Sequence, residues 1–149
     1  TAAAIAPAVL GCNAWRVRSG GWAHVDASHR QERREPNRTL STMLALATDA
    51  TWTARAPHDL VLGADACMAI ALATLLLERR LKLSHHVAFA TFAACLRWPW
   101  PPGLVATMLG VTAIAWSRLA LARHVPADVI AAHCVGTAAG LACHMYATG

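Results

Sequence analysis

The strongest constraint on the fold is that the positive charges gather in short stretches, with long apolar segments between them. Eleven of the thirteen Lys and Arg residues lie in residues 16–38, 79–82 and 118–123. Charged residues make up 14% of the chain and hydrophobic residues 56%, whereas a soluble domain carries about 25% charged residues. The segments between the basic stretches suit the interior of a bilayer. We therefore predict an all-α, polytopic transmembrane helix bundle.

The composition argues against several other classes of protein. One Tyr and two Phe residues, among apolar residues that are mainly Ala, Leu and Val, are untypical of a β-barrel or β-sandwich. Eight acidic residues are too few for a disordered acidic chain, and no run of like charge suits nucleic acid. The five cysteines form no CxxC pair, so we expect them to be small buried side chains.

About six helices are expected in a single domain that covers residues 1–149. Residues 1–16 fall short of the roughly 20 residues that cross a bilayer, and it is open whether part of this helix precedes Thr1. Residues 17–38 are expected to form a basic extramembrane loop. The five later helices are expected at residues 39–53, 59–77, 84–96, 104–116 and 126–146.

The basic stretches also predict how the ends of the helices are arranged. If the helices alternate in direction, all three stretches emerge on one face of the membrane, and only Arg55 and Arg97 lie elsewhere. The positive-inside rule explains such a face as cytoplasmic. The same cations could instead gather around an anion, and the sequence leaves both explanations open.

Residues 117–128 contain the strongest chemical pattern in the chain. Ser117 and Arg118 are followed after five residues by His124, and after three more by Asp128. In a helix that begins near His124, Asp128 faces the same side and can accept the imidazole N–H. The other ring nitrogen is then free to act as a nucleophile. Arg118 offers a planar fork to phosphate oxygens and Ser117 a further hydrogen bond, which suits phosphoryl transfer through a phosphohistidine.

This spacing resembles the third motif, S-R-x5-H-x3-D, of the type-2 phosphatidic acid phosphatase superfamily, and all four fixed positions match. The second motif of that family, P-S-G-H, is matched in part by Leu83-Ser84-His85-His86. Together with Lys82, this segment looks like the K-I/L-S-x-H variant of a bacterial branch.

The first motif of the family, K-x6-R-P, is absent. The segment from Asp26 to Pro36 instead resembles the D-x-x-x-R-x-E-R loop of the same branch, in which Arg30 and Arg33 would be the cations. The resemblance covers roughly residues 24–148, and the interval between the second and third motifs is short for the family.

The resemblance implies a role for each matched residue. His124 would attack the phosphorus, Asp128 would orient His124, and His86 would protonate the leaving oxygen. No metal or other cofactor is implied. The phosphoryl oxygens would be held by Arg118, Ser117, Lys82, Ser84, Arg30 and Arg33.

We therefore expect an integral-membrane phosphatase of a bacterial plasma membrane that hydrolyses a lipid phosphomonoester or diphosphate, of the phosphatidate or polyprenyl phosphate type. Its partners would be the bilayer and this lipid, and no nucleic acid. The sequence leaves open which lipid phosphate is used, which side the site faces, and the oligomeric state.

Two alternative functions remain open. His85, His86, His124 and Asp128 could ligate Zn or Fe in a metal-dependent membrane hydrolase, although no HExxH pattern is present. A non-catalytic relative could bind anionic lipid without turnover. We expect packed or exposed side chains at the remaining histidines, which are His24, His29, His58, His133 and His144.

Overall fold

The computed structural model describes residues 15, 18–19, 30–98 and 100–148, and within these ranges it contains helices and turns but no strand. The all-α prediction is therefore confirmed for the described residues. The first expected helix, residues 1–16, lies outside them except for Trp15. The described helices are α2 (Arg30–Thr53), α3 (His58–Leu77), α4 (His85–Cys95), α5 (Pro101–Ala120) and α6 (Pro126–Thr148).

Three of these helices are long and apolar enough to cross a membrane by length and composition. They are His58–Leu77, Pro101–Ala120 and Pro126–Ala147. The segment expected as a span at residues 84–96 forms α4, which has 11 residues. At 1.5 Å per residue α4 is about 16 Å long, roughly half the thickness of a hydrocarbon core.

The prediction of a loop that ends at residue 38 was wrong in its boundary, because α2 begins at Arg30 and runs for 24 residues. The polar residues at 30–38 are compatible with a loop, but Arg, Gln and Glu are also good helix formers when they face water. The expected span at residues 39–53 is consequently the later part of a longer helix, and α2 is not among the candidate spans.

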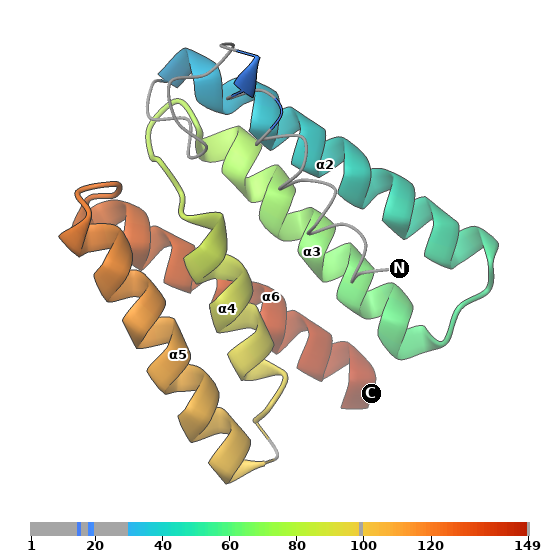
Figure 1. Cartoon of the computed structure of the whole chain (residues 1–149). Helices are drawn as coiled ribbons and strands as arrows, with labels where there is room; N and C mark the ends of the chain where they lie inside the picture. Colours follow the sequence, from blue (N-terminus) through green and yellow to red (C-terminus); the bar gives the residue numbers. More distant parts are fainter. Residues whose placement is uncertain (1–14, 16–17, 20–29, 99, 149) are drawn as a thin grey trace.

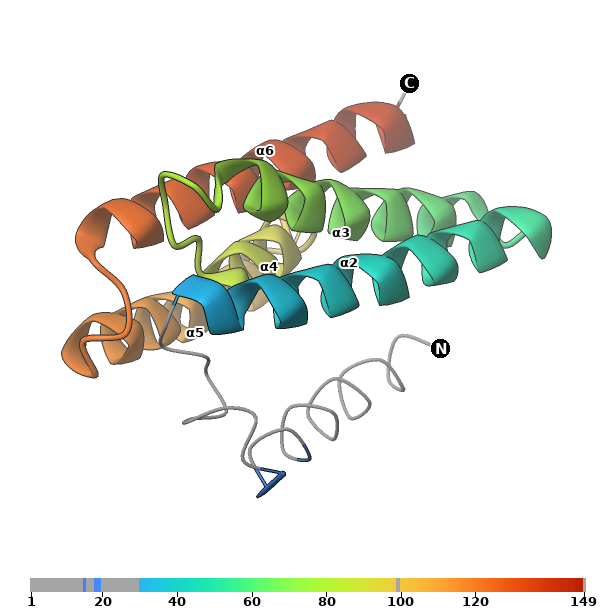
Figure 2. The same ribbon diagram turned by 90° about the horizontal axis from the view of Figure 1, so that it is seen from above.

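The short helix α4 lies in the middle of the bundle. It packs against α6, α5 and α3, while α2 packs along α3 (Figures 1 and 2). Two small residues of α6 allow its close approach to α4. A Cβ atom on Gly136 would overlap the Ala88 carbonyl oxygen, and one on Gly140 would overlap Cys95. The core around α4 includes the fully buried Val87.

Successive helices alternate in direction, so the turns fall at two ends of the bundle (Figure 1). The α3–α4 and α5–α6 connections lie together at one end. The α2–α3 and α4–α5 connections lie at the other end, where Trp52, Trp98 and Trp100 are exposed as expected for an interfacial belt. The Trp52 indole N–H also donates to Asp65 Oδ1 at 3.2 Å, which links α2 to α3.

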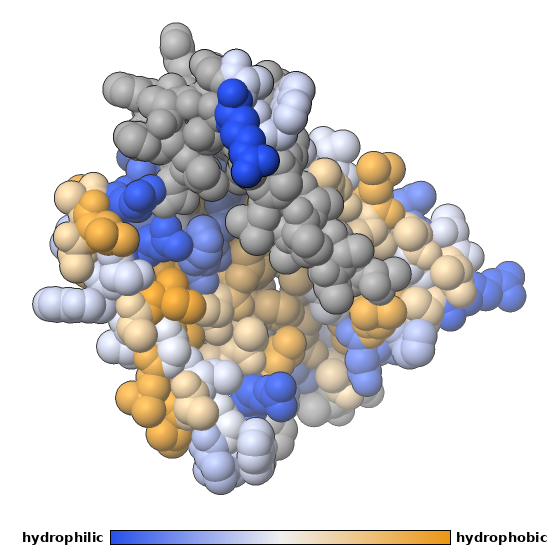
Figure 3. Space-filling model, in the orientation of Figure 1, coloured by the Kyte–Doolittle hydropathy of each residue, from blue (hydrophilic) through white to orange (hydrophobic). Residues whose placement is uncertain are grey.

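The surface of α5 is largely apolar. Val105, Leu109 and Trp116 are more than half exposed. In Figure 3 apolar side chains follow the edge formed by α5, and hydrophilic side chains gather near the α5–α6 connection. A helix that exposes apolar side chains in this way is suited to contact lipid.

Candidate active site

Two connections that are distant in sequence meet at the backbone of Lys82. The Lys82 N–H donates to Asp128 Oδ1 at 2.8 Å, and the Lys82 carbonyl oxygen lies 2.8 Å from His124 Nδ1. One peptide segment of the α3–α4 connection is therefore held by His124 of the α5–α6 connection and by Asp128 in the first turn of α6. This contact brings the second and third sequence motifs together.

The contact with Lys82 fixes the tautomer of His124. A carbonyl oxygen can only accept a hydrogen bond, so His124 Nδ1 must carry the proton, and the lone pair of the neutral ring lies on Nε2. The sequence predicted that the Asp128 carboxylate would accept this proton. Asp128 Oδ2 lies 3.7 Å from Nδ1, which is an ion-pair distance rather than a hydrogen bond. The Lys82 carbonyl takes the expected place of the carboxylate.

The environment of His124 favours its neutral form. Burial lowers the pKa of His124 below its ordinary value. The hydrogen bond to Lys82 and the charge of Asp128 oppose this shift, while the charges of Lys82 and Arg118 add to it. A neutral imidazole with a free Nε2 lone pair is the form that can attack an electrophile.

Asp128 has a structural role as well as an electrostatic one. Its side chain is buried, and its second oxygen, Oδ2, accepts the Val125 N–H at 3.2 Å. A carboxylate in the first helical turn that reaches back in this way satisfies a backbone donor at the helix N-terminus. Asp128 therefore fixes both the start of α6 and the position of Lys82.

Arg118 and Ser117 belong to the last turns of α5 rather than to a separate turn, because α5 extends to Ala120. The Arg118 carbonyl accepts N–H groups of Arg123 and His124, at 3.0 and 3.3 Å. The Ser117 hydroxyl donates to Ile114 O at 2.8 Å within the helix, so its proton is already used. The motif thus brings Arg118 near His124 through the folded end of α5.

Ser84 offers a hydroxyl group in an unusual state. It is the residue before the first turn of α4 and is 1% exposed, and its Oγ has no hydrogen-bond partner among the described residues. A buried hydroxyl without a partner costs free energy. Ser84 is therefore suited to bind a polar atom of a ligand.

The two histidines after Ser84 differ in exposure. His86, the expected proton donor, is exposed, whereas His85 is half-buried and stacks on Phe89 with ring centroids 6.2 Å apart. Burial, together with the charges of the nearby His86 and His124, lowers the pKa of His85 to about 4. His85 is therefore neutral near pH 7.

Arg30 and Arg33 lie in the first turns of α2, which begins at the same end of the bundle as the other candidate residues (Figure 1). Their side chains lie outside the described residues, so their predicted contact with phosphate stays a prediction.

Two contacts of the bundle have no counterpart in the sequence motifs. The role of the Lys82 backbone has no sequence signal, because every residue other than proline has the same main-chain groups. The contact of His133 Nδ1 with Thr91 Oγ1, at 2.8 Å, joins α6 to α4 inside the bundle. Within the described ranges, no group of three or more His, Cys, Asp or Glu side chains is arranged to hold a metal ion.

The chain matches no protein-family model, no curated protein and no solved structure at a significant level. The functional argument therefore depends on the motifs and on the geometry of the residues described above.

Proposed function

We propose that this chain is an integral-membrane lipid phosphate phosphatase that works through a phosphohistidine on His124. The observation that carries the proposal is the contact of His124 Nδ1 with the Lys82 carbonyl at 2.8 Å, which places the lone pair of the neutral ring on Nε2. Arg118 and Lys82 act on His124 electrostatically, so cations surround the nucleophile. Such cations bind phosphoryl oxygens and stabilise the charge of the transition state.

The proposed reaction has two steps. His124 Nε2 forms a bond to phosphorus while the bond from phosphorus to the lipid oxygen breaks, and that oxygen takes a proton from His86. A water molecule then gives a proton to His86 and attacks the phosphorus, which breaks the P–N bond and releases phosphate. Asp128 and the Lys82 carbonyl stabilise the imidazolium that forms between the two steps.

The phosphoryl oxygens in this proposal are bound by the residues that the motifs indicate. The unpartnered, buried Ser84 hydroxyl supports one such contact. The substrate is a lipid phosphomonoester or diphosphate, and the enzyme resides in a bacterial plasma membrane. The other proposed ligands are Arg118, Lys82, Arg30, Arg33 and Ser117, whose hydroxyl would have to turn away from the Ile114 carbonyl to donate to phosphate.

The test is to compare His124→Ala with His58→Ala. His58 is exposed at the opposite end of the bundle and serves as a matched control. Purified full-length protein in phosphatidylcholine nanodiscs is assayed for phosphate release from phosphatidate and from a polyprenyl diphosphate. We expect His124→Ala to lose activity by about 10³-fold or more, and His58→Ala to retain it. Turnover of His124→Ala at the wild-type rate would contradict the proposal.

Inhibitors separate this function from the alternatives. Vanadate adopts the five-coordinate geometry of phosphoryl transfer and should inhibit by bonding to His124 Nε2. Inhibition by EDTA without inhibition by vanadate would favour a metal-dependent hydrolase instead. Tight binding of phosphatidate by the wild-type protein without release of phosphate would favour the non-catalytic relative.

A further inference from the structure

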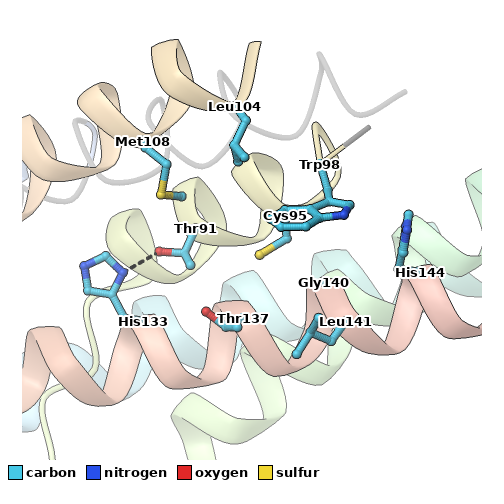
Figure 4. A pocket seen from close by; sticks show the side chains of 10 residues that line it. All are labelled: Thr91, Cys95, Trp98, Leu104, Met108, His133, Thr137, Gly140, Leu141 and His144. Atoms are coloured by element: carbon cyan, nitrogen blue, oxygen red, sulfur yellow. Dashed lines mark hydrogen bonds between the residues drawn. The ribbon is translucent and has the colours of Figure 1, made fainter. Parts of the chain in front are cut away.

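A second feature of the bundle is a pocket of about 430 Å³ between α4, α5 and α6 (Figure 4). Its walls include Thr91, Cys95 and Trp98 on the α4 side, Met108 on α5, and His133 on α6. None of these residues belongs to the candidate active site. The pocket therefore needs an explanation of its own.

The pocket follows from the lengths of the helices around it. The helices α5 and α6 have 20 and 23 residues, whereas α4, which packs against both, has 11. At 1.5 Å per residue, α5 and α6 are roughly 14 to 18 Å longer than α4. The pocket lies between these two longer helices, beside the last turns of α4 and the connection that contains Trp98.

The walls of the pocket suit an apolar ligand. Trp98, Leu104 and Met108 supply apolar surface, and the protein is expected to contact lipid along α5. Thr91 Oγ1 and His133 Nδ1 are hydrogen-bonded to each other at 2.8 Å, as the dashed line in Figure 4 shows. This bond satisfies polar atoms that would otherwise face hydrocarbon.

The pocket is aligned with the candidate active site along α4. Thr91 and Cys95 follow Ser84 by seven and eleven residues, a spacing that keeps all three on one face of the helix. Along the axis they lie about 10 and 16 Å beyond Ser84. The pocket is therefore within reach of the hydrocarbon chain of a ligand whose phosphate is held near Ser84 and His124.

We propose that the pocket binds a single hydrocarbon chain of the lipid whose phosphate occupies the active site. This inference rests on the proposed function. With roughly 30 Å³ for a group of water or methylene size, a volume of 430 Å³ holds on the order of fourteen such groups. That is room for one long hydrocarbon chain. The site therefore selects lipid phosphates by the presence of one ordered chain.

The direct test uses the cysteines of the unmodified protein. Cys95 lines the pocket, and Cys134 is exposed on α6 outside it. Protein in phosphatidylcholine nanodiscs is treated with N-ethylmaleimide, and the alkylation rate of each cysteine is followed by peptide mass spectrometry. We expect hexadecylphosphonate, which cannot be hydrolysed, to slow the alkylation of Cys95 at least 5-fold and to leave Cys134 unchanged.

Two further ligands make this test decisive. Butylphosphonate has the charged group without the long chain, and hexadecanol has the chain without the charged group. Neither should protect Cys95 at the concentration at which hexadecylphosphonate does. Equal protection by either ligand, or no protection by hexadecylphosphonate, would overturn the proposal.

A pair of variants tests the same idea through turnover. Met108→Trp fills the pocket, whereas Leu109→Trp adds the same bulk at the next residue, which is 67% exposed and outside the pocket. We expect the ratio of kcat/KM for hexadecyl phosphate to that for butyl phosphate to fall at least 10-fold in Met108→Trp only. An unchanged ratio in Met108→Trp would overturn the proposal that the pocket binds a hydrocarbon chain. If the wild-type protein releases phosphate from neither compound, nor from phosphatidate or a polyprenyl diphosphate, the proposed function fails, while protection of Cys95 still decides whether the pocket binds a hydrocarbon chain.

Discussion

At the residue scale, the protonation state of His124 decides when the proposed nucleophile is active. Burial lowers its pKa, and the cations of Lys82 and Arg118 add to this effect. Only the neutral ring can attack, so activity is present above the folded-state pKa and is lost as the pH falls through it. We expect His124 to titrate below pH 6.5, the ordinary value for histidine.

The measurement is the pH titration of the His124 ring by NMR, with the resonance assigned by its loss in His124→Ala. NMR is preferred to a rate profile because the substrate phosphate itself titrates near pH 6. A titration midpoint at or above pH 6.5 would mean that burial does not govern the protonation state of the His124 ring.

The second prediction at this scale concerns Asp128→Asn. The carboxylate accepts the N–H groups of Lys82 and Val125, one with each oxygen, and an amide can accept only with its single oxygen. The loss of one acceptor at a buried position costs about 1–3 kcal/mol of stability. The imidazolium also loses its counter-charge, so kcat is expected to fall about 10²-fold or more.

Thermal unfolding and kcat are measured on the same preparation of Asp128→Asn. A fall in the unfolding temperature with normal kcat would restrict Asp128 to a structural role, which would contradict its part in the mechanism.

The residues of the site differ in how well the sequence could predict them. The spacing of Arg118, His124 and Asp128 reflects the turn between two helices, and the structure places these residues together at one end of the bundle. The partner of His124 could not be predicted, since the bond goes to a main-chain carbonyl 42 residues away. Which of His85 and His86 is exposed also depends on the neighbouring helices.

At the element scale, the end of α5 contains a residue in a costly conformation. Ala122 has a φ of 50°, a left-handed value that favours glycine. The N–H groups of Ala122 and Arg123 donate to the carbonyls of Leu119 and Arg118, which is the usual hydrogen-bond pattern of such a helix end. We expect Ala122→Gly to stabilise the protein by about 1 kcal/mol, because the left-handed conformation costs a residue with a Cβ atom about that much.

The unfolding temperature of Ala122→Gly is compared with that of Ala113→Gly, an exposed position in the middle of α5 that should lose up to about 1 kcal/mol. If both variants lose stability, the φ value of Ala122 carries no strain.

The contact of α4 with α6 leads to a second prediction for an element. A Cβ atom on Gly136 would overlap the Ala88 carbonyl oxygen and lie 2.9 Å from Thr91 Cβ. We expect Gly136→Ala to destabilise the protein by about 1–3 kcal/mol through overpacking. Gly63→Ala in α3, where a Cβ atom meets nothing within 4 Å, should instead stabilise by up to about 1 kcal/mol. Unfolding measurements in the same detergent compare the two, and equal effects would mean that the approach of α4 to α6 is not tight.

The elements themselves were predicted unevenly. The last helix was predicted to begin at residue 126 and does so, because Pro126 suits a first turn. The end of α4 at Cys95 is close to the predicted end at residue 96. A helix of 11 residues is nevertheless too short for the membrane span that was expected there. The start of α2 was missed because charged residues at 30–38 are compatible with either a loop or a solvated helix.

At the scale of the whole molecule, the alternating helices predict that two sets of basic residues lie on opposite sides of the membrane. Arg80 follows α3 at the active-site end, and Arg97 follows α4 at the other end; both are exposed. We expect cysteines introduced as Arg80→Cys and Arg97→Cys to react with a membrane-impermeant maleimide from opposite faces of intact cells or inverted vesicles. Permeabilised membranes, in which both should react, provide the control. Reaction of both from the same face would contradict the alternating arrangement.

The all-helical class, as far as the described residues show it, could be predicted because composition and charge spacing are properties of the complete chain. The length of α4 could not, since hydropathy alone does not distinguish a helix long enough to cross a membrane from a half-length helix held between its neighbours. The pocket beside α4 could not be predicted either, because it depends on how this short helix packs between α5 and α6.

The two hydrogen bonds that hold the Lys82 backbone also have a consequence during synthesis of the protein. The chain is synthesised from its N-terminus at roughly 5–20 residues per second, and Asp128 follows Lys82 by 46 residues. The side chains of His124 and Asp128, which form these hydrogen bonds, are therefore synthesised roughly 2 to 9 s after Lys82 itself. During that interval the growing polypeptide has no assembled nucleophile. Under the proposed function, a nascent or prematurely terminated chain is inert towards the lipid phosphates around it, and reactivity begins only when the last helix has joined the others.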